Sequence, residues 1–284
     1  MAECAADLAA LADATALLSP GPLIRLAKDR LEVDLAPRAG GRIAQIRFDG
    51  EEQLVGPGDG GSAAIAWGCY PMVPWAGRIR DGRFAFDGKS YQLHRNYEGH
   101  AIHGFGFVSA WTVDACSADA ASLHVRLPRE AFWPFGGIAR QGIELGKDQL
   151  RMVLSIEAEE HAMPAVIGWH PWFRKPERLD FAPSHVHPRD RDGIATLPLA
   201  APGPSPWDDC FIHAGEVALH HRRWQLQLLS ECSHWVVFDA LAHTTCVEPQ
   251  TGPPDAFNLG CDVVAPGASI EMSMTLAWHD LQQD

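Results

Sequence analysis

Short runs in which apolar and polar residues alternate recur along most of this chain, and they constrain its fold more than any other feature. In "ASIEMSMTLAWHD", Ile270, Met272, Met274, Leu276 and Trp278 fall on one face of an extended strand, and their neighbours are mostly polar. The segments "SLHVRL", "QLRMVLSIEAE", "WQLQLLS" and "HWVVFDAL" alternate in a similar way. No long helical pattern separates these runs, which excludes an architecture of alternating strands and helices.

The turns between these runs are supplied by 21 prolines and 26 glycines among 284 residues. A large antiparallel sheet structure needs many such turns. We therefore predict an all-β chain folded as a large antiparallel β-sandwich. Because all-β domains commonly reach about 200–250 residues as one unit, we expect a single domain over residues 21–284.

Residues 1–20 are expected to form a helical extension in front of that domain. Leu8, Leu11, Leu17 and Leu18 fall roughly on one face of a helix. The segment lacks both the basic start and the continuous apolar stretch of a signal peptide. No run of about 18 apolar residues occurs in the chain, so no transmembrane helix is expected either. The sequence thus predicts a cytoplasmic protein.

The charge balance argues against anionic partners. Lys and Arg number 23 and Asp and Glu number 36, which gives a net charge of −13 at pH 7. A chain of this charge repels phosphate backbones and anionic lipid. Nucleic acid and membrane surfaces are therefore not expected as partners.

The cysteines and histidines do not form a recognisable metal or disulfide pattern. Seven cysteines lie far apart without any C-x-x-C spacing, so we expect reduced, buried thiols. His185 and His187 share one strand face and His220 and His221 are adjacent, but neither pair has a third ligand nearby. A first-row metal needs three or four converging ligands. We expect these histidines to be solvated, and we expect no metal and no cofactor.

Four short motifs rich in Gly, Pro and aromatic residues each surround one polar residue that is able to take part in catalysis or binding. Arg78 lies in "PWAGRIRDGRFAF", His103 in "GHAIHGFGF", His170 in "IGWHPWF" and Glu248 in "VEPQTGPP". Acyl or phosphoryl transfer has no comparable support, since the chain contains neither G-x-S-x-G nor a Gly-rich phosphate loop. Each motif alone is a weak signal, but their combination in one all-β chain indicates a site.

In this order the motifs resemble those of the aldose 1-epimerase (galactose mutarotase) family. The resemblance covers roughly residues 23–278 and includes "RIRDGRF", "HGFGF", "HPWF", "WDDCF", "EPQTGPPDAFN" and "APGASIEMSM". It implies the large sandwich of that family, often called a supersandwich. It also implies a mutarotase, which interconverts the α and β anomers of an aldose without metal or cofactor.

The resemblance also implies roles for individual residues. Glu248 matches the general base of the family and His170 the general acid. The remaining matches concern the substrate: His103 is the second active-site histidine, Arg78 binds sugar hydroxyls, and Asp208 binds substrate. Adjacent Asp209 is the alternative to Asp208, because two consecutive aspartates can be aligned with the single aspartate of the family motif in two ways. Gln250 is a possible neighbour of the site.

Ring opening of a cyclic aldose requires a base at the C1 hydroxyl and an acid at the ring oxygen, each of which contributes roughly 10²–10⁴-fold. We expect Glu248 and His170 on opposite sides of the sugar, with the glutamate ionised and the histidine protonated. Arg78 offers forked donors to vicinal hydroxyls. Four tryptophans near the motifs are candidates for stacking on the sugar ring: Trp75, Trp169, Trp172 and Trp207.

The chain departs from the family pattern at two motifs, which leaves the sugar itself open. Gly77 stands before Arg78 where members of the family commonly carry Asn. Trp169 stands before His170, where they also tend to carry Asn. We expect an aldose substrate, with a hexose phosphate as an alternative if Arg189 and Arg191 meet a phosphate. Those arginines are better explained as solvated loop charges paired with Asp190 and Asp192.

Two further functional classes remain open, as does the oligomeric state. One is a noncatalytic sugar-binding or sensing protein on the same fold, and the other is a metal-dependent sugar isomerase on a β-barrel. Glycoside hydrolysis ranks lower, because no second acid lies near Glu248 in the motifs. We expect a monomer or a homodimer.

Overall fold

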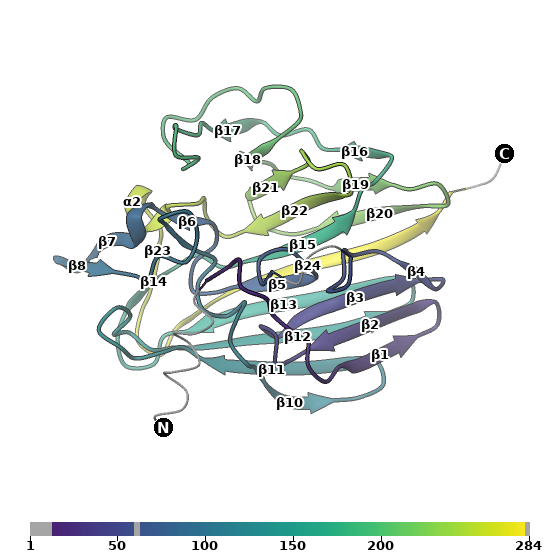
Figure 1. Ribbon diagram of the computed structural model, residues 1–284, viewed down its shortest axis with the longest axis horizontal. Coiled ribbons are helices and arrows are strands. Elements are labelled where there is room, and N and C mark those ends of the chain that lie inside the picture. The colour runs from purple at the N-terminus through teal and green to yellow at the C-terminus, as the bar shows by residue number, and fades with distance from the viewer. Residues whose placement is uncertain (1–12, 60–62, 282–284) are drawn as a thin grey trace.

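The computed structural model describes residues 13–59 and 63–281, which form two large antiparallel sheets stacked face to face (Figure 1). One sheet has ten strands and the other has eight, and three two-stranded ribbons lie beside them. The all-β sandwich predicted from the alternating runs is therefore confirmed.

The ten-stranded sheet holds the segments of greatest functional interest. Its order is β1-β2-β3-β5-β15-β22-β21-β18-β17, with β4 beside β3. The bounds are β1 Ile24–Lys28, β2 Leu31–Ala36, β3 Arg42–Phe48, β4 Glu51–Glu52, β5 Cys69–Met72, β15 Gly168–Arg174, β17 His185–His187, β18 Asp208–Ile212, β21 His234–Phe238 and β22 Thr244–Gln250.

The eight-stranded sheet has the order β10-β11-β12-β13-β24-β20-β19-β16. Its bounds are β10 Thr112–Cys116, β11 Ala120–Arg126, β12 Ile138–Gly146, β13 Gln149–Glu157, β16 Arg178–Asp180, β19 Val217–His220, β20 Trp224–Leu229 and β24 Ser269–Asp280. The ribbons and short helices are β6 Arg78–Ile79 with β9 Ala101–Ile102, β7 Arg83–Phe86 with β8 Lys89–Gln92, β14 Met163–Ala165 with β23 Asp262–Val264, η1 Arg80–Gly82 and α2 Ala256–Leu259.

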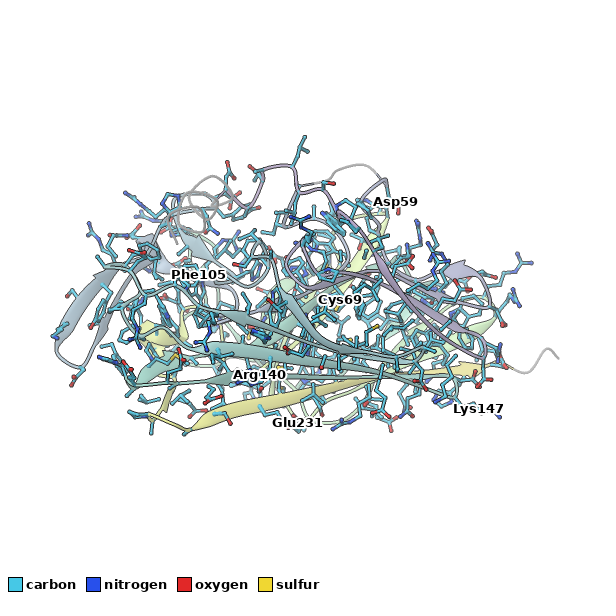
Figure 2. The ribbon with its side chains drawn as sticks, turned by 90° about the horizontal axis from the view of Figure 1, so that it is seen from below. Asp59, Cys69, Phe105, Arg140, Lys147 and Glu231 are labelled. Carbon is cyan, nitrogen blue, oxygen red and sulfur yellow. The ribbon has the colours of Figure 1, made fainter. Side chains whose placement is uncertain are left out.

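The core forms where the inward faces of the two sheets meet. In the long pair β13–β24, Met152 lies opposite Met274 and Leu154 opposite Met272, and all four side chains are buried. In the view of Figure 2, Cys69 lies within the side-chain layer, whereas Glu231 lies at the outer surface. The alternation read from the sequence thus corresponds to one buried and one exposed face in the strands of the second sheet.

The expected N-terminal helix is not formed over residues 13–20. Instead, Ala14–Ala16 form a turn and bend, and Leu17 makes an isolated antiparallel bridge to Ala63. Asp13 accepts hydrogen bonds from both the backbone N–H and the hydroxyl of Thr15, a local alternative to helical bonding. The remainder of the expected helix, residues 1–12, lies outside the described residues.

A buried arginine joins the ten-stranded sheet to the loops above it. The guanidinium of Arg42, which is fully buried, donates hydrogen bonds to the backbone carbonyls of Ala39, Ala64, Trp67 and Phe107 at 2.7–2.9 Å. Burial lowers its pKa to about 9, so it remains charged at neutral pH. A single side chain therefore holds three chain segments together.

Replacing Arg42 with Lys should destabilise the fold strongly. A lysine ammonium is compact and cannot reach four carbonyls that surround a planar guanidinium, so buried acceptors would lose their donors at about 1–3 kcal/mol each. We expect the free energy of unfolding in urea to fall by about 2–4 kcal/mol. The matched change Arg126→Lys, at an exposed ion pair with Glu159, should shift it by less than about 0.5 kcal/mol. Equal effects of the two changes would contradict this role of Arg42.

Candidate functional site

Backbone pairing across five strands aligns residues from three distant sequence motifs, together with Tyr70 and Val236, on one face of the ten-stranded sheet. Tyr70 pairs with His170, Glu248 pairs with Val236, and Val236 pairs with Cys210. The β15–β22 pairing matches Gly168 to Gln250 and Trp172 to Cys246, which sets His170 opposite Glu248. The register thus builds one row, Tyr70–His170–Glu248–Val236–Cys210.

A second row on the same face follows from the two-residue period of a strand. It consists of Trp172, Cys246, Phe238 and Asp208. Asp209 pairs with Val237 and therefore belongs to the opposite face of β18, although it also borders the cavity described below. The register therefore favours Asp208 over Asp209 as the aspartate that accompanies Glu248.

The β6–β9 ribbon and its flanking turns form a wall above these rows. Arg78 pairs with Ile102, and His103 follows directly. The N–H of Gly77 donates to Nδ1 of His103 at 3.2 Å, and the N–H of His103 donates to the carbonyl of Gly77. Gly77 has a φ of +70°, and an added Cβ would lie 2.6 Å from Cβ of Pro254. The glycine that departs from the family pattern is thus required by this close packing.

Sheet face and wall enclose a cavity of about 350 Å³. The five residues identified in the sequence, Arg78, His103, His170, Asp208 and Glu248, all line it. They come from β6, the turn after β9, β15, β18 and β22. The structure therefore brings all five to one place, a volume suited to a small ligand.

Glu248 and His170 form the floor of this cavity in direct contact. Oε1 of Glu248 lies 3.2 Å from Nε2 of His170, and the amide of Gln250 donates to Oε2 of Glu248 at 3.4 Å. Glu248 is 2% exposed and His170 is 7% exposed. The two groups therefore lie side by side on neighbouring strands, and the expectation of opposite sides of the sugar is not met by this geometry.

Burial also opposes the expected charge state of the pair. Burial raises the pKa of Glu248 well above its usual value, and Asp208 raises it further. Burial lowers the pKa of His170 to about 3. The neutral carboxyl and neutral imidazole are favoured in the free protein, because transferring a charge into a buried site costs solvation. The pair as a whole still holds one proton.

His103 and His170 are positioned by rings and hydrogen bonds. The His170 ring lies between Tyr70 and Trp172, with centroids at 4.7 and 5.3 Å and small interplanar angles. Burial lowers the pKa of His103 well below its usual value. Since Nδ1 of His103 accepts from Gly77, its neutral ring carries the proton on Nε2 and offers it as a donor.

Each arginine of the cavity is matched by a carboxylate. Nη2 of Arg78 lies 3.0 Å from Glu98, and Nη1 of Arg189 lies 2.6 Å from Asp208. Arg191, which we considered with Arg189, is largely exposed and lies 3.7 Å from Asp192. The cavity therefore offers fixed hydrogen-bonding groups without an excess of positive charge.

Of the four tryptophans near the motifs, Trp172 lines the cavity. Trp75 and Trp169 belong to the sandwich core. Trp207 packs against Phe181 and Phe211. Proximity in sequence to a motif was therefore a poor guide to which indole faces the ligand.

Sequence reasoning missed three residues at this site. Tyr70 stacks on His170, Cys246 shares the strand face of Glu248, and the ring of Tyr97 lies 5.2 Å from the guanidinium of Arg78. The two-residue period of a strand could have predicted Cys246, since it lies two positions before Glu248 on β22. Tyr70 and Tyr97 carry no such signal, because their places depend on strand pairing and loop packing.

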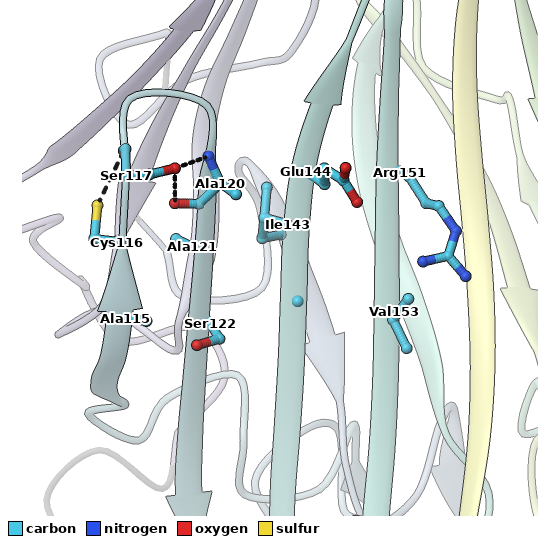
Figure 3. A pocket seen from close by; sticks show the side chains of 11 residues that line it. Ala115, Cys116, Ser117, Ala120, Ala121, Ser122, Ile143, Glu144, Arg151 and Val153 are labelled. Carbon is cyan, nitrogen blue, oxygen red and sulfur yellow. Dashed lines mark hydrogen bonds between the residues drawn. The ribbon is translucent and has the colours of Figure 1, made fainter.

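A second hollow, of about 370 Å³, lies on the outer face of β10–β13 (Figure 3). It arises where small residues such as Ser122 and Gly142 stand side by side. Its charged groups are Glu144 and Arg151, which pair across β12 and β13. Among the described residues that line it there is no histidine, so it offers no acid–base pair comparable to Glu248 and His170.

The six described cysteines are free thiols; Cys69, Cys210, Cys232 and Cys246 are buried as expected, whereas Cys116 is exposed and Cys261 is half-buried. Two of the histidines considered as metal ligands have other partners: Nδ1 of His187 bonds to the carbonyl of Thr196, and Nε2 of His220 bonds to Asp180. Among the described helices, none has the length and apolarity needed to span a bilayer.

Comparison with known proteins identifies the family of this chain. Residues 22–276 match the sequence profile of aldose 1-epimerases. The chain belongs to the aldose 1-epimerase family. It is 29% identical over 151 residues to the uncharacterized protein YphB of Escherichia coli K12, a match that spans 52% of this chain and about half of that relative, 50%.

Two solved structures place this family member among galactose mutarotase-like folds. A galactose mutarotase-like protein from Clostridium acetobutylicum superposes with a TM-score of 0.81 at 19% identity, covering 91% of this chain and 95% of that one. The galactose 1-epimerase from Lactobacillus acidophilus NCFM gives a TM-score of 0.78 at 16% identity, covering 92% and 95%. At these identities the likeness concerns the fold.

The buried state of His103 should appear in the pH dependence of stability. Its folded pKa lies below the unfolded value of about 6.5, so the unfolded chain binds more protons below pH 6.5 and stability falls on acidification. When the pH falls from 7 to 5, the free energy of unfolding of the wild type should therefore decrease by about 1–2 kcal/mol more than that of His103→Gln. The measurement is urea unfolding of both proteins at each pH. Identical losses in the two proteins would show that His103 is solvated.

Proposed function

We propose that this family member is an aldose 1-epimerase, which interconverts the α and β anomers of an aldose by opening and closing the ring. The observation that carries this proposal is the 3.2 Å contact between Glu248 and His170 on the floor of a cavity of about 350 Å³. The C1 hydroxyl and the ring oxygen of a pyranose are bonded to the same carbon. A base and an acid that serve these two oxygens must therefore lie side by side.

In the proposed mechanism, the carboxylate of Glu248 takes the proton of the C1 hydroxyl while the imidazolium of His170 protonates the ring oxygen. The bond from C1 to the ring oxygen breaks and a C1 carbonyl forms. After rotation about the C1–C2 bond, the two groups return the protons in exchanged roles and the ring closes on the other face. Glu248 and His170 together hold one titratable proton both before and after ring opening. The neutral carboxyl and imidazole favoured by burial therefore become the reactive carboxylate and imidazolium when that proton moves from Glu248 to His170.

Three buried polar atoms, one of them on His170 itself, would hold the sugar. Nε of Arg78, Nδ1 of His170 and Oε1 of Gln250 are buried and have no hydrogen-bond partner among the described residues. Buried polar atoms are costly unless they are partnered, and sugar hydroxyls both donate and accept. His103 adds an Nε2 donor, and Trp172 adds an apolar ring face.

A neutral aldose fits this cavity better than a hexose phosphate. A phosphate site needs arginines free to form charge-assisted bonds. Arg78 and Arg189 are instead bound to Glu98 and Asp208, and Glu248 adds a third acidic group. We therefore favour a neutral aldose over a phosphorylated sugar as the substrate.

The noncatalytic alternative, sugar binding or sensing alone, explains the cavity but not the buried pair. A binding site gains nothing from a carboxyl and an imidazole placed 3.2 Å apart at the cost of their desolvation. We further propose that the enzyme acts in the cytoplasm as a monomer or homodimer and needs no cofactor, in line with its charge and sequence.

Glu248→Gln should abolish most of the activity. The change keeps size and hydrogen bonding but removes the base, which is worth about 10²–10⁴-fold. The measurement is the relaxation of freshly dissolved α-D-glucose and α-D-galactose to anomeric equilibrium, followed by polarimetry. Glu216→Gln, at an exposed position, should retain the wild-type rate. Full activity of a folded Glu248→Gln protein would refute the proposed mechanism.

The pH profile of kcat/KM should be flat through the range in which a solvated histidine titrates. The pair takes up a second proton only near the pKa of His170, lowered to about 3 by burial. Between pH 7.5 and 5 the anomerisation rate, corrected for the uncatalysed reaction, should change less than about twofold, whereas an ordinary imidazole would titrate near 6.5. A sigmoid centred at that value would show that His170 is solvated in the working enzyme.

A further inference from the structure

Three metal-ligating side chains that the proposed reaction does not use together meet at the base of the cavity: His170 and Glu248 line it, and Cys246 lies buried beside them. One ligand atom each from His170, Cys246 and Glu248 lies within 4.8 Å of the others, and all three residues are buried. Cys246 is held there by register: it precedes Glu248 by two positions on β22 and pairs with Trp172 of β15. The cluster thus rests on the central strands of the sheet and not on a loop.

The spacing of Glu248 and His170 is close to that of two ligands in a tetrahedral metal site, and the distances that involve Cys246 lie within 4.8 Å. Two ligands on one zinc ion, at bonds of about 2.0–2.2 Å, lie roughly 3.3 Å apart. Oε1 of Glu248 and Nε2 of His170 are already 3.2 Å apart. The other ring nitrogen, Nδ1 of His170, is buried and has no partner among the described residues, so no hydrogen bond at that nitrogen opposes a change in the orientation of the ring.

We propose that His170, Cys246 and Glu248 form a binding site for a zinc-class divalent cation, such as Zn²⁺ or Cd²⁺, and that the bound ion inhibits the epimerase. The thiolate and imidazole select borderline and soft ions over Mg²⁺ or Ca²⁺. Binding replaces the thiol proton of Cys246 and the carboxyl proton of Glu248 with one divalent ion, and two protons leave to solvent.

Charge balance favours this occupant. A thiolate, a carboxylate and a divalent cation together are neutral, so the complex places no net charge in the buried floor. The fourth position of the ion would face the cavity, through which it enters. Inhibition follows because the lone pairs of Glu248 and His170 that would move protons are bonded to the ion; this part of the inference rests on the proposed function.

The binding test does not depend on activity. Cd²⁺ is titrated into the full-length, reduced and metal-free protein, and the thiolate-to-cadmium charge-transfer band is followed in the ultraviolet. Cys246→Ala removes the thiolate of the proposed site. Cys210→Ala is the matched control, because Cys210 is also buried and belongs to the same strand row as Glu248. Cys116→Ala removes the thiol that is exposed among the six described cysteines.

We expect wild type, Cys210→Ala and Cys116→Ala to share a saturable band that Cys246→Ala lacks. An unchanged band in Cys246→Ala, or a band lost in Cys116→Ala, would overturn the site. In parallel, anomerisation is measured with rising Zn²⁺, each variant relative to its own metal-free rate. The zinc concentration for half-inhibition should rise at least about tenfold in Cys246→Ala.

The failures of the two proposals are distinguishable. A protein that binds Cd²⁺ through Cys246 but never accelerates anomerisation keeps the metal site and refutes the epimerase. Zinc that inhibits wild type and Cys246→Ala at the same concentration refutes inhibition through this site. A metal-free protein that is inactive and gains activity with Zn²⁺ also overturns the proposal, and it points to the metal-dependent isomerase considered from the sequence.

Discussion

The antiparallel pairing of β15 with β22 is the constraint on which the rest of this site depends. It sets His170 opposite Glu248 and Trp172 opposite Cys246, so one ladder of backbone hydrogen bonds determines the acid–base pair and its surroundings. A slip of one residue would turn every side chain of one strand to the other face. The buried hydrophobic face of the same strands, with Trp169 and Val247 in the core, makes such a slip costly. The geometry of the site is therefore protected by the packing of the sandwich.

The loops beside the ten-stranded sheet are held by a different kind of interaction. Arg42 binds carbonyls of the segments around Ala39, Ala64–Trp67 and Phe107 and lies over the rings of Trp67 and Tyr70. Tyr70 in turn stacks on His170. A buried guanidinium without a carboxylate thus supports the platform beneath the imidazole, and it does so through hydrogen bonds to backbone oxygens, which every residue type supplies.

The sequence predicted the fold and the convergence of the motifs better than the chemistry of the site. Alternation identified the strands because burial of one face leaves a period of two in the residues themselves. Family resemblance identified Arg78, His103, His170, Asp208 and Glu248, all of which line one cavity. The charge state of the pair was expected to be ionic, and burial reverses it. Desolvation depends on how many atoms surround a group in three dimensions, which no short motif reports.

Burial of the pair has two opposite consequences. It keeps a single proton on Glu248 and His170 over a wide range of pH, because gaining or losing a proton would leave a net charge in a poorly solvated place. The same lack of solvation favours any ligand that removes protons without leaving charge behind. A divalent ion held by a thiolate and a carboxylate meets that condition, and Cys246 on β22 supplies the thiolate. Replacing Cys246 by an apolar residue would keep the first property and remove the second, so the two can be separated by a single side chain.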